Sequence, residues 1–472
     1  MKRRLLFLFA LLILLSGLSL SFNTAHANTS VGQVSGKCVN PNGTTVLHGK
    51  LQGAFFTISV PSNWNGTLVL YSHGYVFKGQ PLLNPAPDAG DPLTEAELLH
   101  EGYALTGSSY SQNGWALQQA FHDQITLLDY FNATCGHPNR TIAWGHSLGG
   151  IITAGLVQLF PDRFVAALPM CGVVAGGIGT WNQALDSAFA FDVLLANNAL
   201  PIVHLTHPVG TYNKAEAILT AAQNTASGKA RIALASALAD IPGWFDPKSP
   251  EPGSKDYTAQ EQNQFLWESQ VDFIFAFEAR AELEARAGGN PSWNTSVDYR
   301  TQLAHSADSS EVMALYKKAG LNLNQDLNTL NSTQRIKADP EAVDYLNQYI
   351  TFDGDLNMPV LTMHTTGDGL VVNQDEQAYK SVVDWRGDSN LLRQVFVHRA
   401  GHCAFTPAET VTAFHTLIHR LATGTWDDFT DPGLMNKEAL ALGKKLNTAP
   451  PSFLNFEPTV FLRPFDARNR YL

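Results

Sequence analysis

The chain has 472 residues, of which 44% are hydrophobic and 15% are charged, and its formal net charge is −11. This length and composition predict a globular protein with one large hydrophobic core and room for an inserted subdomain. The acidic balance, with no Lys- or Arg-rich stretch after the first residues, argues against nucleic acid as a partner.

Residues 1–27 have the features of a secretory signal. Met1-Lys-Arg-Arg4 precedes a largely apolar run from Leu5 to Leu20, and Ala25-His-Ala27 forms a small-x-small cleavage site. The apolar run is short for a membrane span, and no later segment has 18 consecutive apolar residues, so we expect no membrane span. We predict an extracellular or periplasmic protein that is cleaved near Ala27.

Strand-like and helix-like segments alternate after the signal. Residues 31–60 predict an edge β-region, and its clearest strand is at 54–60. Further strands are predicted at 66–72, 103–107, 140–144 and 164–170, and helices near 94–101, at 116–132 and at 151–160. This alternation predicts an α/β protein with a doubly wound, mostly parallel sheet.

A serine stands in a glycine-rich turn between the predicted strand at 140–144 and the predicted helix at 151–160. The turn reads Gly145-His-Ser-Leu-Gly149, with Ser147 at its centre. In so tight a strand-to-helix turn, the glycines avoid clashes and the serine hydroxyl projects above the sheet. The helix that follows points the positive end of its dipole at a developing anion. Ser147 is our candidate nucleophile; the alternative is a turn that only caps a helix.

Residues 172–356 are too many for a simple connection inside a compact domain. Helical signals recur along them, at 181–198, 214–225, 230–240, 259–286, 309–319 and 340–350. We therefore predict a helical cap over the candidate site. Its aromatic clusters at 264–267 and 272–277 are interpreted as the cap's own core. The alternative is a substrate wall that includes Trp267 and Phe275, and the loop at 108–115 is a further candidate for the pocket lining.

A serine nucleophile needs a general base, and the base needs an acid that orients it. Both should follow the nucleophile along the chain, the acid first. The apolar run at 359–364 predicts a buried strand, and the loop after it presents Asp368, our candidate acid. The rival carboxylates precede this strand, at the wrong end of the sheet, or open the next helix; they are Asp353, Asp355 and Asp375.

A further predicted strand, at 391–398, leads into Gly401-His402 and then into a predicted helix at 407–422. His402 lies in this loop, where a general base belongs. The chain has 15 histidines, so position matters more than residue type. His146 adjoins the nucleophile, but neighbouring side chains diverge in a tight turn. We expect structural roles for the other nearby histidines, which are His398, His415 and His419.

An oxyanion hole needs two backbone N–H groups. One would belong to Leu148, directly after the nucleophile. The other should come from the loop after an early central strand, where His73-Gly-Tyr75 follows the strand at 66–72. Gly74 lets this backbone turn inward, so we predict the Tyr75 N–H as the second donor; the alternative is a plain strand-ending turn.

Together these segments resemble the α/β-hydrolase superfamily. Ser72-His-Gly-Tyr75, Gly145-His-Ser-Leu-Gly149, Gly367-Asp368 and Gly401-His402 occur in that family's order, each after a predicted strand. The resemblance covers about residues 50–171 and 357–425, and it implies the fold and acyl-transfer chemistry. We therefore predict a hydrolase core at 28–171 and 357–472 and a helical cap, or lid, at 172–356. The C-terminal tail should wrap back over the body, because it carries Phe453, Phe456, Phe461 and Phe465.

Four cysteines in an exported chain predict two disulfides, for which three pairings exist. In the proposed fold, Cys171 ends the strand after the nucleophile helix and Cys403 follows His402, so both lie at the catalytic face. Cys38 and Cys135 both precede central strands, towards the opposite face. We favour Cys171–Cys403 with Cys38–Cys135; four free buried thiols are the alternative.

The leading interpretation is a secreted serine hydrolase that cleaves carboxylic esters of a small molecule or a polymer. Ser147 would attack the carbonyl carbon while His402 takes its proton and Asp368 holds the imidazole. Zinc-site spacing, a Walker loop and a dinucleotide-binding glycine motif are missing from the sequence, so we expect no metal and no cofactor. The alternatives are an exported serine peptidase that removes short or proline-containing N-terminal peptides, and a non-catalytic ligand-binding protein.

Overall fold

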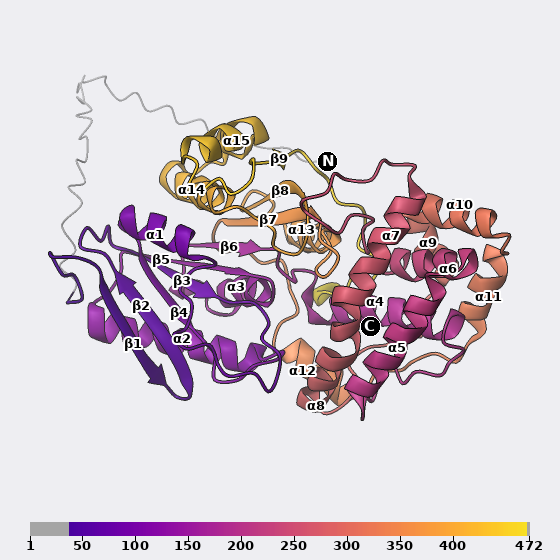
Figure 1. Cartoon of the computed structure of the whole chain (residues 1–472). Coiled ribbons are helices and arrows are strands. Elements are labelled where there is room, and N and C mark those ends of the chain that lie inside the picture. The colour runs from indigo at the N-terminus through magenta and orange to yellow at the C-terminus, as the bar shows by residue number, and fades with distance from the viewer. Residues whose placement is uncertain (1–36, 470–472) are drawn as a thin grey trace, which may run out of the picture. The chain divides into compact units, whose positions relative to one another are not determined.

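A nine-stranded mixed sheet forms the centre of the structure, a computed structural model that describes residues 37–469 (Figure 1). The strands lie in the order β1-β2-β4-β3-β5-β6-β7-β8-β9. They are β1 (Thr45–Leu51), β2 (Ala54–Val60), β3 (Thr67–Ser72), β4 (Ala104–Ser108), β5 (Arg140–His146), β6 (Ala166–Met170), β7 (Val360–Gly367), β8 (Leu392–Ala400) and β9 (Phe453–Leu454). The signal predicted at residues 1–27 lies outside the described residues.

The pairing pattern confirms the predicted α/β class. From β4 to β8 in spatial order, all neighbouring strands are parallel. The antiparallel pairs lie at the edges, where β1 and β2 precede β4 and where β9 follows β8. Because parallel strands end at the same edge of a sheet, the segments that follow β3, β5, β7 and β8 all begin at one edge.

Helices cover both faces of the sheet (Figure 1). These are α1 (Pro92–His100), α2 (Leu117–Cys135), α3 (Leu148–Leu159), α13 (Gln374–Arg386), α14 (Pro407–Thr423) and α15 (Pro432–Ala441). One face buries Val69, Trp144 and Leu168 of the strands against Leu98 of α1 and Phe414 of α14. Helix α14 begins sharply because Thr406 and Glu409 form a capping box and Pro407 takes the first helical position.

A helical insertion connects β6 to β7. It contains α4 (Gly176–Leu194), α5 (Pro208–Ala222), α6 (Ala226–Ala237), α7 (Tyr257–Trp267), α8 (Arg280–Ala287), α9 (Tyr299–His305), α10 (Ser309–Ala319), α11 (Leu323–Ser332) and α12 (Pro340–Gln348). Two π-helical segments, Glu268–Asp272 and Phe275–Ala279, lie between α7 and α8. The insertion has a hydrophobic core of its own, in which Phe189, Phe191 and Phe277 are buried. Its division from the rest at residues 172 and 356 stays a prediction.

The C-terminal segment returns to the sheet and to the insertion. Phe453 is buried in β9, which pairs with β8, and Phe461 is buried against Ala175 and Val372. Arg463 donates hydrogen bonds to Asp186 of α4 and to the Trp293 carbonyl. Phe456 is 38% exposed, so the tail leaves this ring partly at the surface. Among the described residues, no helix combines the length and the hydropathy of a membrane span.

Candidate active site

Ser147 lies in a sharp turn between β5 and α3. Its backbone angles are φ 59° and ψ −124°, which only a strongly constrained turn imposes on a residue other than glycine. The Ser147 N–H donates to the Met170 carbonyl at 3.0 Å, which holds the turn against β6. A Cβ atom at Gly145 or at Gly149 would collide with the Ser72 carbonyl oxygen. The two glycines therefore let the turn approach the end of β3.

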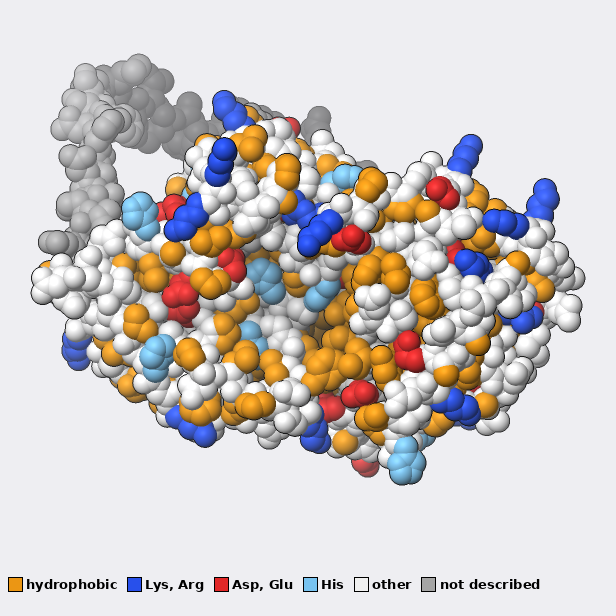
Figure 2. All heavy atoms as spheres, viewed as in Figure 1, with side chains coloured by type: hydrophobic (Ala, Val, Ile, Leu, Met, Phe, Trp, Pro, Cys, Tyr) orange, Lys and Arg blue, Asp and Glu red, His pale blue; other side chains and the backbone are white. Residues whose placement is uncertain are grey.

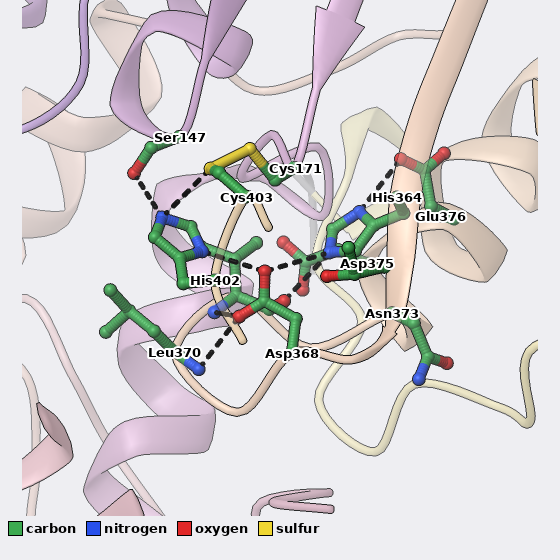
Figure 3. Close-up of polar contacts among 12 residues, drawn as sticks. Ser147, Cys171, His364, Asp368, Leu370, Asn373, Asp375, Glu376, His402 and Cys403 are labelled. Carbon is green, nitrogen blue, oxygen red and sulfur yellow. Dashed lines mark hydrogen bonds and ion pairs between the residues drawn. A yellow bond between two sulfur atoms is a disulfide. The ribbon is translucent and has the colours of Figure 1, made fainter. Parts of the chain in front are cut away.

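His402 and Asp368 lie next to this serine, as Figure 3 shows. The Nε2 atom of His402 is 2.7 Å from the Ser147 hydroxyl oxygen, and its Nδ1 atom is 2.8 Å from Asp368 Oδ2. The other carboxylate oxygen of Asp368 accepts hydrogen bonds from the N–H groups of Leu370 and Val371, both at 3.1 Å. The carboxylate is buried and held on both oxygens, so the imidazole has a fixed partner.

The rival carboxylates lie elsewhere and have other partners. Asp355 forms an ion pair with Arg386, and Asp353 accepts a hydrogen bond from the backbone of residue 355. Asp375 is buried at the start of α13 and accepts from the N–H of Ala175. The structure therefore brings only Asp368 of these four carboxylates into contact with His402.

The rival histidines also have partners away from the serine. The Nδ1 atom of His146 shares a hydrogen bond with the Tyr71 hydroxyl. Burial lowers the pKa of His146 to about 4. The His398 ring packs at a tilt against the Trp244 ring, and its Nε2 atom is near Glu251. The two histidines of α14 contact carboxylates: His415 lies between Glu101 and Glu438, and His419 is near Asp427.

The backbone groups predicted to bind an oxyanion flank Ser147. Leu148 is the first residue of α3, and the first N–H groups of a helix have no partner within it. Tyr75 and Leu148 line the same cavity as Ser147. A Cβ atom built on Gly74 would lie 3.4 Å from the Ser147 Cβ, so the loop before Tyr75 touches the nucleophile turn. This arrangement is compatible with the predicted pair of donors.

Both disulfides have the favoured pairing. Cys38 is bonded to Cys135, and Cys171 is bonded to Cys403. The second bond joins the end of β6 to the loop of His402, and Cys403 Sγ lies 3.4 Å from His402 Nε2. These three side chains approach each other as metal ligands would, but the two sulfur atoms are already bonded to one another.

Removing the Cys171–Cys403 bond should reduce both stability and turnover. The bond closes a 232-residue loop, and a disulfide contributes about 2–4 kcal/mol to the free energy of unfolding. We expect the Cys171→Ser/Cys403→Ser variant to lose turnover as well, because the His402 loop loses its anchor. The matched control is Cys38→Ser/Cys135→Ser, which should lose stability alone. Denaturant unfolding and turnover, both measured where each variant is folded, test this; equal turnover in the two variants would contradict it.

A cavity opens at Ser147 between the sheet edge and the helical insertion. Its apolar wall includes aromatic residues from four segments, which are Tyr75, Trp115, Trp181, Phe273 and Phe275. Two carboxyl groups from the first π-helical segment, those of Glu268 and Asp272, also line it. In the space-filling view, hydrophobic side chains gather around a hollow in this face of the molecule (Figure 2). The cavity can therefore accept a ligand with apolar, flat surfaces.

The aromatic clusters of the insertion have divided roles. Phe273 and Phe277 are buried in the insertion's own core, as expected, but Phe273 also reaches the cavity. Phe275 lies on the cavity wall, with its ring centroid 5.4 Å from that of Tyr75. Trp267 is 2% exposed and does not line the cavity, because its ring is turned towards Phe245 and its N–H donates to the Trp244 carbonyl. The suggestion that Trp267 forms a substrate wall is therefore wrong.

Sequence reasoning missed two residues behind the candidate acid. His364 of β7 and Glu376 of α13 are buried, and the His364 Nε2 atom lies 3.6 Å from Asp368 Oδ2 (Figure 3). A histidine at the end of an apolar run and a glutamate in a helix carry no local signal of a shared site. Their contact depends on how α13 packs against the sheet.

Part of the chain, and most of it in a second comparison, is similar in sequence to known proteins. Residues 101–176, which span β4 to the start of α4 and include the nucleophile turn, match the prolyl oligopeptidase family. The chain has the α/β-hydrolase fold. The chain is 29% identical over 420 residues to an o-phthalyl amidase of Xanthobacter agilis, and the match covers 82% of the chain and 89% of the amidase.

Two solved structures are similar to this chain at low sequence identity. The acylaminoacyl peptidase of Pyrococcus horikoshii has 10% identity and a TM-score of 0.37, with coverage of 87% of this chain and 42% of the peptidase. The chain thus spans less than half of that peptidase's length. The rice cell wall degrading esterase LipA of Xanthomonas oryzae has 13% identity and a TM-score of 0.34, with coverage of 73% and 78%.

Proposed function

We propose that this α/β-hydrolase is a serine hydrolase that transfers an aromatic acyl group from a carboxylic ester or amide to water. The observation that carries the proposal is the contact of the Ser147 hydroxyl with His402 Nε2 at 2.7 Å, with Asp368 on the other ring nitrogen. A hydroxyl is a weak nucleophile at neutral pH, and a base in direct contact with it removes this obstacle.

The reaction would proceed in two halves. His402 takes the Ser147 proton as the hydroxyl oxygen attacks the carbonyl carbon, and the new oxyanion accepts from the N–H groups of Leu148 and Tyr75. His402 then gives its proton to the leaving alcohol or amine. Water repeats the sequence on the acyl-enzyme, with His402 again as the base, and releases the carboxylic acid. Asp368 keeps the Nδ1–H of His402 directed away from the serine.

The cavity supports an aromatic acyl group. Its wall is mainly aromatic and aliphatic, and flat rings pack well against such walls. Both π-helical segments contribute to it, through Asp272 and Phe275, and π-helical turns are frequent at functional sites. The similarity to an o-phthalyl amidase favours amides of such acids as a second substrate class beside esters. The match to the prolyl oligopeptidase family favours a peptidase, the third class to be tested.

We further propose that the protein acts outside the cytoplasm. Two disulfides support this, because such bonds persist in oxidising compartments and are rare in reducing ones. The Cys171–Cys403 bond lies at the proposed active site, so the compartment would bear directly on activity.

Three matched substrate sets test the proposal. We expect the hydrolase to cleave the p-nitrophenyl ester and the p-nitroanilide of one aromatic acid, the ester faster, and to prefer these over aliphatic acyl groups. Aminoacyl and prolyl p-nitroanilides, which peptidases accept, should be poor substrates. Faster cleavage of the aminoacyl anilides than of the aromatic ester would assign a peptidase instead. No turnover of any set would refute the proposed function.

Phe275 should influence substrate choice more than the nearby Trp267 does. We expect Phe275→Ala to change the ratio of kcat/KM between aromatic and aliphatic esters, because it removes one ring from the cavity wall. The change should correspond to about 1–3 kcal/mol in the difference between the two activation free energies. Trp267→Ala is the matched control: it removes a larger buried ring outside the cavity, so it should lower stability by about 3–5 kcal/mol and leave this ratio near its original value. Kinetics on paired esters and thermal unfolding distinguish the two effects.

A further inference from the structure

His364 lies directly behind the candidate acid. It is fully buried in β7, and Nε2 is 2.8 Å from the Val371 carbonyl oxygen and 3.6 Å from Asp368 Oδ2. Its Nδ1 atom is 3.2 Å from Glu376 Oε1. Both ring nitrogens thus face oxygen atoms of carbonyl or carboxylate groups, which accept hydrogen bonds and, when ionised, donate none. With an ionised Glu376, satisfying both contacts takes a proton on each nitrogen, which would make the ring an imidazolium cation.

The carboxylate of Glu376 is oriented towards the His364 ring. Its Oε2 atom accepts from the Thr362 hydroxyl and from the Gln394 amide, both at 2.5 Å, so Oε1 is left to face His364. Thr362 and Gln394 lie on β7 and β8, which fix the carboxylate from the sheet side. The resulting chain of contacts runs from Glu376 through His364, Asp368 and His402 to the serine (Figure 3).

The other titratable groups around His364 do not replace Glu376 as its counterion. Asp375 of α13 is buried, and burial raises its pKa to about 8. Burial and the charges of Glu268 and Asp368 hold the pKa of Asp272, in the first π-helical segment, well above its usual range. Burial thus disfavours the ionised form of both groups. Burial lowers the pKa of His364. The hydrogen bond and charge of Glu376, together with the charge of Asp368, outweigh burial and raise this pKa to about 9.

We propose that His364, held as a cation by Glu376, is a positioning residue that keeps Asp368 ionised and directed at His402. A buried carboxylate beside further carboxyl groups tends to take up a proton, and a neighbouring cation opposes this. The proposal rests on the proposed function, because it describes how the pair of Asp368 and His402 works as a unit.

The sign of the effect follows from electrostatics. Removing the positive charge favours proton uptake by the coupled pair of Asp368 and His402, whichever of the two takes the proton. The acid limb of kcat/KM, which reports this uptake in the free enzyme, should therefore move to higher pH. For a charge several ångströms away in a partly polar interior, the shift is on the order of one pH unit.

The variant to test is His364→Gln, measured by the pH profile of kcat/KM on an aromatic p-nitrophenyl ester. We expect its acid limb to move up by on the order of one pH unit, with roughly tenfold less activity on the acid side of the limb. The matched control is His415→Gln. His415 also lies between two carboxylates, those of Glu101 and Glu438, and burial lowers its pKa but these contacts raise it to about 9. It does not line the cavity, so this control should keep the original acid limb.

A second variant and a second measurement keep the test decisive. Glu376→Gln preserves the side-chain shape, and nitrogen-15 spectra of the histidine rings should show His364 protonated at pH 7 in the parent and losing its proton at lower pH in this variant. A folded His364→Gln protein with an unshifted acid limb, or a neutral His364 ring in the parent at pH 7, would overturn the proposal. If no acyl substrate is turned over, the proposed function fails separately, and the His402 ring pKa in the same spectra still decides the role of His364.

Discussion

Ser147→Ala should abolish acyl hydrolysis while the protein stays folded. Members of a nucleophile–base pair act as a unit, so we expect turnover to fall on the order of 10⁴–10⁶-fold. His402→Ala and the Ser147→Ala/His402→Ala double variant should lose similar amounts, because the 2.7 Å contact between the two side chains is what activates the hydroxyl. If the two residues worked independently, the increases in activation free energy of the two single variants would add in the double variant. Ester kinetics on all three proteins measure this directly.

Labelling provides the control for this experiment. A fluorophosphonate probe should modify Ser147 in the parent protein and should leave Ser147→Ala unlabelled. Ser310→Ala, at an exposed position of α10, is the matched serine control and should retain both labelling and turnover. Turnover near the parent level in a folded Ser147→Ala protein would refute the serine mechanism.

Asp368→Asn should produce the second largest loss. Asparagine keeps the side-chain shape and an oxygen that can accept from the N–H groups of Leu370 and Val371. Its amide nitrogen would then face His402 Nδ1, which favours the tautomer with the proton on Nε2. That tautomer cannot take the Ser147 proton, so we expect turnover to fall on the order of 10⁴-fold.

The control for this substitution is Asp353→Asn, which changes a carboxylate that precedes β7 and does not contact His402. It should leave turnover and fluorophosphonate labelling near parent values. Thermal unfolding of both variants separates loss of the acid from loss of the fold. An Asp368→Asn protein that is folded and within tenfold of the parent would show that another group orients the imidazole.

Local chemistry carries most of the information about the central sheet. The strand predicted at 54–60 agrees with β2 residue for residue, and the nucleophile turn lies between β5 and α3. Both depend on contacts between near neighbours: buried strands read as apolar runs, and a tight turn requires glycines. Four short elements were not predicted, namely α9, α11, α15 and β9.

The sequence by itself predicted which serine, aspartate and histidine come together, because Ser147, Asp368 and His402 each follow a recognisable strand and parallel strands end at one edge of a sheet. Only the tertiary structure decided which aromatic side chains line the cavity, since Phe275 reaches it and Trp267 does not. It also decided that His364 lies between Glu376 and Asp368. These outcomes depend on how helices pack against the sheet, and side chains that meet through packing carry no pattern that a single sequence displays.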